Sequence, residues 1–258
     1  MNPRHHDGGA GDADYGVIGR EYVAYRRPEP RIAAMILAAL GPARRVLNVG
    51  AGAGSYEPTD REVVAVEPSA AMRAQRPAHL TAAIDATAER LPFPDGHFDA
   101  AMTTFSIHQW PDLEAGLAEM RRVTTGPVVV LTCDPDLVQR FWLNDYAPGV
   151  LAAEARRYPA PDRVASALGG GAEITPVPIP LHCQDGFNEA YYGRPERLLD
   201  AGARLACSAW SFVDDATARA CVDHLARDLV SGAWDARLGH LRAQPEFDGS
   251  LRLIVSRP

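Results

Sequence analysis

The stretch VLNVGAGAGSYEP, residues 46–58, decides the fold of this chain. It opens with a short, mostly apolar run that is typical of a buried strand, and Gly50, Gly52 and Gly54 follow at alternate positions. Glycine weakens a strand and costs backbone entropy on folding, so three glycines at a strand end need a local reason. Either the backbone takes conformations that other residues avoid, or another group approaches the main chain closely. The stretch therefore predicts a strand followed by a tight turn that faces a ligand.

Further strands and helices alternate around this stretch. We expect helices where apolar residues recur at helical spacing, and strands where apolar runs are short and continuous. Ser69 and Asp112 are typical N-caps of two of these helices. The alternation predicts an α/β fold with a parallel sheet that is covered on both faces. The expected helices span residues 29–40, 69–77 and 112–125, and the expected strands span residues 45–49, 62–68, 80–84, 97–106 and 127–134.

The second half of the chain is organised differently. It reads as helix and loop over 134–170 and as mostly helical over 189–245, with a proline-interrupted strand near 173–183. We expect the segments 134–170 and 188–245 to cover the carboxyl ends of the strands, where ligands bind in such sheets. The predicted organisation is a disordered tail over 1–14, an N-terminal cap segment over 15–45, a ligand-binding core over 46–133, a helical cap over 134–248 that includes the one core strand, and a closing strand over 249–258.

Length and composition limit the class of protein. The chain has 258 residues, of which 47% are hydrophobic, and this suits one large domain with a sizeable core. The formal net charge is −7 and no run of lysine or arginine occurs, so we expect no nucleic-acid partner. No apolar run approaches the length of a membrane span or forms a signal peptide, and no two of the four cysteines have C-x-x-C spacing. We therefore expect a cytoplasmic protein with reduced thiols, without a membrane partner and of undetermined oligomeric state.

Glu67 indicates which kind of ligand the glycine turn faces. It ends the second strand, 17 residues after Gly50, where a carboxylate accepts hydrogen bonds from both hydroxyls of a ribose. The dinucleotide fingerprint G-x-G-x-x-G would need a third glycine at Ser55, and only residues 50–62 separate the two strands. That leaves little room for a helix that faces a pyrophosphate. The sequence therefore predicts a nucleoside ligand without phosphate and disfavours NAD.

The region from Val46 to about Cys133 resembles the class I S-adenosylmethionine-dependent methyltransferases of the small-molecule type. VLNVGAGAG resembles the first motif of that family, and VVAVEPSAAM resembles its ribose-binding second motif. AERLPFPDGHFDAAMTTFSIHQW resembles the third and fourth motifs, in the family's order and spacing. The resemblance implies a Rossmann-like, mostly parallel sheet with an antiparallel last strand and an interleaved helical cap. It also implies an enzyme that uses S-adenosylmethionine as its methyl donor.

The resemblance assigns cofactor-binding residues position by position. The glycine turn would pack against the methionine part, Glu67 would bind the ribose, and Met72 would lie near the adenine. The N-terminal segment would fold over the cofactor. The implied cofactor-binding residues are Asn48, Gly50, Ala51, Gly52, Gly54, Glu67, Pro68, Met72, Thr87, Ala88, Glu89, Thr104, Phe105 and Tyr22.

Two positions depart from the family pattern. Relatives often have Asp at the position of Thr87, so the carboxylate contact to the adenine amine falls on another residue, for which Asp85 is a candidate. Many relatives have Asp or Glu at the position of Asn48, where a carboxylate helps to hold the cofactor's ammonium group. Asn48 keeps a carbonyl acceptor without the charge, or alternatively satisfies neighbouring backbone groups.

The acceptor-binding and catalytic residues are assigned more loosely. His108 follows the strand that ends near the reacting methyl group, and it is either the general base or a structural histidine. Aromatic side chains of the cap and of the N-terminal segment either bind the acceptor or pack in the core. The candidate substrate-binding residues are Tyr15, Arg26, Trp142, Tyr146, Tyr191 and Tyr192.

The predicted function is methyl transfer from S-adenosylmethionine to the oxygen, nitrogen or carbon nucleophile of a small molecule, a specialised metabolite or its precursor. The acidic metal-binding pattern of catechol methyltransferases is not recognisable, so we expect no metal. Two alternatives stay open at this point. One is a non-catalytic S-adenosylmethionine-binding partner protein, and the other is an NAD-dependent oxidoreductase.

Overall fold

The computed structural model of the chain describes residues 22–258. The predicted tail over 1–14 and Tyr15 lie outside the described residues, as does the side chain of Tyr22. No helix in the described part of the chain is long and apolar enough to cross a membrane. The four cysteines are free thiols, and all but Cys221 are buried.

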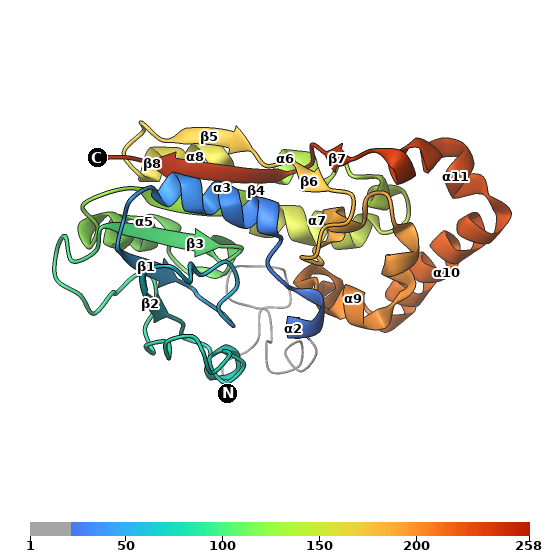
Figure 1. The fold of residues 1–258 in the computed structure, drawn as a ribbon. Helices are drawn as coiled ribbons and strands as arrows, with labels where there is room; N and C mark the ends of the chain where they lie inside the picture. Colours follow the sequence, from blue (N-terminus) through green and yellow to red (C-terminus); the bar gives the residue numbers. More distant parts are fainter. Residues whose placement is uncertain (1–21) are drawn as a thin grey trace.

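A six-stranded sheet forms the centre of the fold, in the order β2-β1-β3-β4-β8-β5 (Figure 1). The first four of these strands are parallel, whereas β8 runs antiparallel to both β4 and β5. This arrangement confirms the predicted class, a mostly parallel sheet with an antiparallel last strand. The strands are β1 (Arg45–Val49), β2 (Glu62–Val66), β3 (Ala100–Thr104), β4 (Val128–Cys133), β5 (Glu173–Pro176) and β8 (Leu251–Ser256).

Helices surround the sheet. Ser69 and Asp112 cap helices α4 and α5 as predicted, because their side chains accept bonds from the backbone N–H groups of Met72 and Ala115. The helices are α2 (Tyr22–Tyr25), α3 (Pro30–Leu40), α4 (Ala70–Arg73), α5 (Leu113–Arg122), α6 (Pro135–Val138), α7 (Pro148–Arg157), α8 (Pro161–Ala167), α9 (Ala201–Leu205), α10 (Asp215–Ser231) and α11 (Ala233–Leu238). Short 3-10 turns, of which Ile107–Gln109 follows β3, connect several of them.

The strands bury both faces, as their near-continuous apolar sequence requires. Successive residues of a strand point to opposite faces, so Val46 packs in one core with α3, and Leu47 packs in the other core with α5 and α8. In Figure 1 helix α3 lies in front of the sheet and α5 and α8 lie behind it. Helices α7, α9, α10 and α11 lie beyond the carboxyl ends of the parallel strands.

Three expectations about elements were wrong. Residues 80–84 form no strand, and a single bridge joins Ile84 to Val66. These residues lie at the edge of the sheet, where they are at least partly exposed and bury little apolar surface. The expected strand near 173–183 divides, so that β5 joins the main sheet and β6 (Ile179–Pro180) pairs with β7 (Glu246–Phe247). Helix α8 packs against α5 and β8 on a face of the sheet and does not belong to the cover over the strand ends.

A buried carboxylate joins the cap to the last strand. Glu189 accepts hydrogen bonds from the backbone N–H of Ser250 at 3.0 Å and from its hydroxyl at 2.7 Å. Its side chain is buried, and burial raises the pKa of the Glu189 carboxyl to about 7, although the bonds from Ser250 oppose the shift. The folded protein therefore binds a proton at Glu189 that the unfolded chain has already released in mildly acidic solution.

This linkage predicts a pH dependence of stability. Between about pH 4.5 and 7 the folded state binds more protons at Glu189 than the unfolded state, so the free energy of unfolding falls as the pH rises, by up to about 1.4 kcal/mol per pH unit. We expect Glu189→Gln to lose this component, because an amide does not titrate. Urea unfolding of both proteins at several pH values measures it, and parallel pH profiles would contradict the assignment.

Candidate functional site

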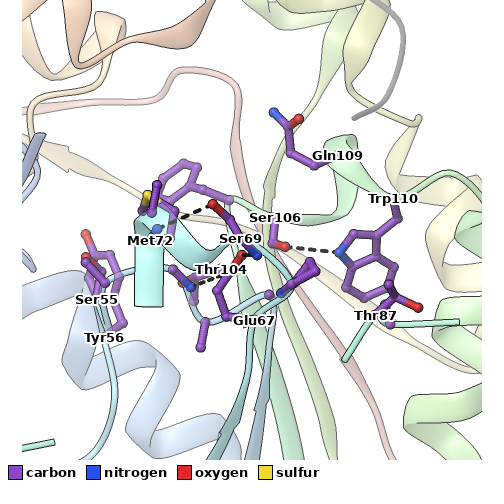
Figure 2. Close-up of a pocket in the computed structure, with 18 of the residues that line it drawn as sticks. Ser55, Tyr56, Glu67, Ser69, Met72, Thr87, Thr104, Ser106, Gln109 and Trp110 are labelled. Atoms are coloured by element: carbon purple, nitrogen blue, oxygen red, sulfur yellow. Dashed lines mark hydrogen bonds between the residues drawn. The ribbon is translucent and has the colours of Figure 1, made fainter. Parts of the chain in front are cut away.

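A cavity of about 640 Å³ opens at the carboxyl ends of the parallel strands. It lies where the sequence predicted a ligand, beyond the ends of β1, β2 and β3. In Figure 2, Ser55 and Tyr56 lie on one side of the view, Thr87 and Trp110 on the other, and Glu67 between them. The cavity lining includes these predicted residues: Gly50, Ala51, Gly52, Glu67, Pro68, Met72, Thr87, Ala88, Glu89, Thr104, Phe105 and Arg26.

The glycine turn is shaped by its protein neighbours. Gly50 has φ 64°, and a methyl group on it would lie 1.8 Å from Ser106 Oγ. Gly52 has φ 52°, and its N–H donates to Glu67 Oε2 at 2.8 Å. Both explanations offered for the glycines therefore apply, since the backbone is left-handed and another group approaches it closely. The approaching group at Gly50 is a side chain of the loop after β3.

Glu67 is held rigidly at the middle of the cavity. Its two carboxylate oxygens accept from the backbone N–H groups of Gly52 and Ser69, each at 2.8 Å. Burial raises the pKa of Glu67, and these two hydrogen bonds oppose the shift. Each oxygen retains capacity for a further donor, because a carboxylate offers about four acceptor positions. The carboxylate is thus oriented for a ligand that presents hydroxyl donors.

The Tyr56 end of the cavity contains an ion pair. Arg26 donates to both oxygens of Asp185, with Nε at 2.5 Å from Oδ1 and Nη2 at 3.4 Å from Oδ2. The Tyr56 hydroxyl donates to Asp185 Oδ2 at 2.9 Å. These residues come from the N-terminal segment, the glycine turn and the cap, and all three line the cavity.

The charges that line the cavity favour a cationic ligand. Among the described lining residues, Arg26 is the one cation, whereas Glu67, Glu89 and Asp185 are carboxylates. A surplus of carboxylates in a partly enclosed space attracts positive charge and repels phosphate.

Other predicted site residues lie away from this cavity. Asn48 donates to Glu57 Oε1 at 3.0 Å and does not line it, and a methyl group on Gly54 would meet Leu80 and not a ligand. The aromatic candidates of the cap also lie elsewhere, which corrects the expectation that they line a site. They pack or hydrogen-bond among cap residues: Trp142 Nε1 donates to Tyr192 O, Tyr146 OH donates to Asp228, Tyr191 lies under Arg194, and Tyr192 stacks on Phe247.

His108 lines a second, smaller cavity of about 40 Å³, which shares Arg26 and Phe105 with the first. Its ring centroid lies 4.5 Å from that of Tyr158, and no described residue hydrogen-bonds to its Nδ1. Burial lowers the pKa of His108 well below 6.5, and the charges of Arg157 and Arg26 add to the effect. His108 is therefore neutral at pH 7 and able to accept a proton.

Several lining residues were missed from the sequence. Trp110 lines the cavity, and its Nε1 donates to Ser106 Oγ at 3.0 Å. Gln109 and Pro111 come from the same loop, and their closeness in sequence to Phe105 was a usable signal. Asp185 gave no such signal, because it is brought to the cavity from the cap by its pairing with Arg26.

Comparisons with known proteins agree with this geometry. A family model described as a methyltransferase domain matches residues 47–131. A solved structure from Anabaena variabilis, described as a putative methyltransferase from an antibiotic biosynthesis pathway, is 30% identical and superposes with a TM-score of 0.84. The match covers 90% of this chain and 98% of that one. This chain belongs to the class I S-adenosylmethionine-dependent methyltransferases.

Curated relatives match this methyltransferase over a shorter region. Demethylmenaquinone methyltransferase of Mycolicibacterium gilvum is 33% identical over 99 residues, which are 37% of this chain and 43% of the relative. The protein of the same name from Beutenbergia cavernae is 43% identical over 98 residues, which are 34% of this chain and 40% of the relative. The chain thus spans less than half the length of these relatives. The fold alone also occurs in the cyclase SpnF, which is 14% identical with a TM-score of 0.55, covering 94% of this chain and 92% of that one.

The residues present fit the cofactor of the family. S-adenosylmethionine carries a sulfonium, an ammonium and one carboxylate, so its net charge is positive and suits a cavity with one cation and three carboxylates. Glu67 stands in the middle of the cavity with acceptor capacity for ribose hydroxyls. The volume is within the range of pockets that enclose ligands of this size.

The close approach at Gly50 predicts a stability difference between two glycines. Gly232, with φ 78° and ψ 5°, lies in the left-handed region, and a methyl group on it meets no described atom within 4 Å, so Gly232→Ala should cost only the left-handed backbone penalty of about 1–2 kcal/mol. Gly50→Ala also carries a positive-φ penalty, and in addition it displaces Ser106, which should add about 1–3 kcal/mol. Chemical denaturation measures both free energies, and equal losses would show that Ser106 moves aside freely.

Proposed function

We propose that this methyltransferase transfers a methyl group from S-adenosylmethionine to a small-molecule acceptor. The observation that carries the proposal is the carboxylate-rich cavity, centred on Glu67, at the carboxyl ends of the strands. The middle of the cavity suits a ribose. The end lined by Thr87, Ala88 and Glu89 suits the adenine, which the sequence resemblance also places there.

The chain's own residues would contribute position and proton transfer. When bound, S-adenosylmethionine supplies a methyl group on a sulfonium, which is already reactive toward nucleophiles. The protein therefore has to hold the acceptor in line with that methyl group, exclude water and remove a proton where the acceptor carries one. Phe105 lies at the boundary of the two cavities, with the Arg26 guanidinium 5.0 Å from its ring centre. We place the reacting end of the acceptor near this boundary.

The rival cofactor NAD suits the cavity poorly. Its pyrophosphate would face three carboxylates and one cation, which is electrostatically unfavourable. The connection from Gly50 to Glu62 contains no helix, so no helix N-terminus faces the position of a phosphate.

Cofactor binding tests the proposal directly. Titration calorimetry should show that S-adenosylhomocysteine binds and NAD does not. Glu67→Gln should weaken S-adenosylhomocysteine binding about 10- to 100-fold, because charged hydrogen bonds to the ribose are lost. Glu62→Gln, at the exposed start of the same strand, is the matched control and should change the affinity less than about threefold. Binding of NAD but not of S-adenosylhomocysteine would refute the proposal.

For the acceptor we propose a specialised metabolite or its precursor with an acidic O–H, N–H or C–H group. The similar structure from Anabaena variabilis is described as part of antibiotic biosynthesis, which supports this class. His108 lines the adjoining cavity and is neutral, so it could take such a proton, although its lowered pKa makes it a weaker base than a free imidazole. A non-catalytic binding protein is the alternative, and it would bind the cofactor without turning over any acceptor.

A role of His108 as general base makes a kinetic prediction. His108→Asn should lower kcat about 10²- to 10⁴-fold and leave S-adenosylhomocysteine affinity nearly unchanged, since His108 does not line the larger cavity. The wild type should lose activity only as the pH falls well below 6.5, because the pKa of His108 is lowered. Methyl transfer to an acceptor found by screening gives the pH profile. A variant with wild-type kcat and a lower Tm would show that His108 only packs against Tyr158.

A further inference from the structure

The cavity contains one ion pair between described lining residues, Arg26 with Asp185. The pair lies at the Tyr56 end, because the Tyr56 hydroxyl donates to Asp185, and Figure 2 shows Tyr56 on the opposite side of the view from Thr87. Asp185 is buried, with 2% of its surface exposed, although it borders the cavity. A buried ion pair that faces a ligand cavity presents both signs of charge to the ligand at fixed positions.

The hydrogen bonds of Asp185 leave it able to accept one more donor. Among residues 22–258, Oδ2 accepts from Tyr56 OH and Arg26 Nη2, whereas Oδ1 accepts from Arg26 Nε alone. A carboxylate offers about two acceptor positions on each oxygen. An ammonium group is the donor that suits such a position best, because its hydrogen bond to a carboxylate is charge-assisted.

No other acidic side chain is available at this end of the cavity among the described residues. Asn48, on β1, is neutral and donates to Glu57. Glu57 is held by Arg76, with both of its oxygens 2.9 Å from guanidinium nitrogens, and it does not line the cavity. Glu67 lies in the middle of the view in Figure 2, and Glu89 follows two residues after Thr87, which marks the far end. A cationic group at the Tyr56 end would therefore meet Asp185.

We propose that Asp185 binds the ammonium group of the cofactor and Arg26 binds its carboxylate, so that the ion pair recognises the amino-acid end as a zwitterion. This inference rests on the proposed cofactor. It assigns a residue of the cap and a residue of the N-terminal segment to binding of the methionine part of that cofactor. Binding then joins three segments, because Asp185 also accepts from Tyr56 of the glycine turn and pairs through its backbone with Arg26. Cofactor occupancy thus holds the cap against the N-terminal segment.

The test compares S-adenosylhomocysteine with its analogue that lacks the amino group, using titration calorimetry on the full chain. Asp185→Asn should weaken binding of S-adenosylhomocysteine about 10- to 100-fold and change binding of the amine-free analogue less than about threefold. Methylthioadenosine, which lacks the whole amino-acid part, should bind wild type and variant alike and so reports an intact cavity. Where Asp185→Asn fails to fold, Asp185→Glu serves instead, because it keeps the charge but displaces it from the ammonium.

The outcomes separate this inference from the proposed function. Equal weakening of both ligands by Asp185→Asn would show that Asp185 only braces the fold, and unchanged binding would place the ammonium elsewhere. Either result overturns the inference while the cofactor assignment stands. Failure of the wild type to bind S-adenosylhomocysteine would refute the proposed function and this inference together. Selective weakening of the amine-bearing ligand supports it.

Discussion

The carboxylate of Glu67 is the interaction on which the cavity depends. It accepts N–H groups from Gly52 and Ser69, so one side chain fixes the turn after β1 and the start of α4. The Glu67 carboxylate loses hydration by its burial at the end of a strand, and this burial raises its pKa. The two backbone donors offset that cost and orient the remaining lone pairs. Rigidity and ligand recognition therefore come from the same group.

The sequence predicted the part of the fold that local pattern controls. Each parallel strand from β1 to β4 is a short apolar run, and the caps at Ser69 and Asp112 follow from side-chain chemistry within four residues. The segment 80–84 failed because alanines at an exposed edge give too little burial to hold a strand. Whether such a segment forms an edge strand depends on how much apolar surface the rest of the sheet leaves uncovered. The local sequence does not contain that information.

The residues of the candidate site show the same difference between what the local sequence locates and what it does not. Gly50, Gly52 and the residues at the ends of β2 and β3 line the cavity, because topology alone brings the carboxyl ends of parallel strands together. The aromatic candidates of the cap were chosen by residue type and lie elsewhere. Trp142 packs edge-on against Trp234 with ring centres 5.5 Å apart, which is how large aromatic side chains gain most from burial. Asp185 could not be found, since its place depends on pairing over 159 positions of sequence.

The dependence on distant pairing has a functional consequence. Arg26, Tyr56 and Asp185 meet only when the N-terminal segment, the glycine turn and the cap are all folded against one another. A ligand that bridges charges on these segments stabilises their assembled arrangement and cannot bind as strongly to a partly open one. The cavity that recognises the cofactor and the cap that would enclose the acceptor are then coupled through one buried ion pair. In such an arrangement the ligand adds its own charge pairs to the Arg26–Asp185 contact that already joins the cap to the N-terminal segment, so cofactor binding would stabilise the acceptor site as well.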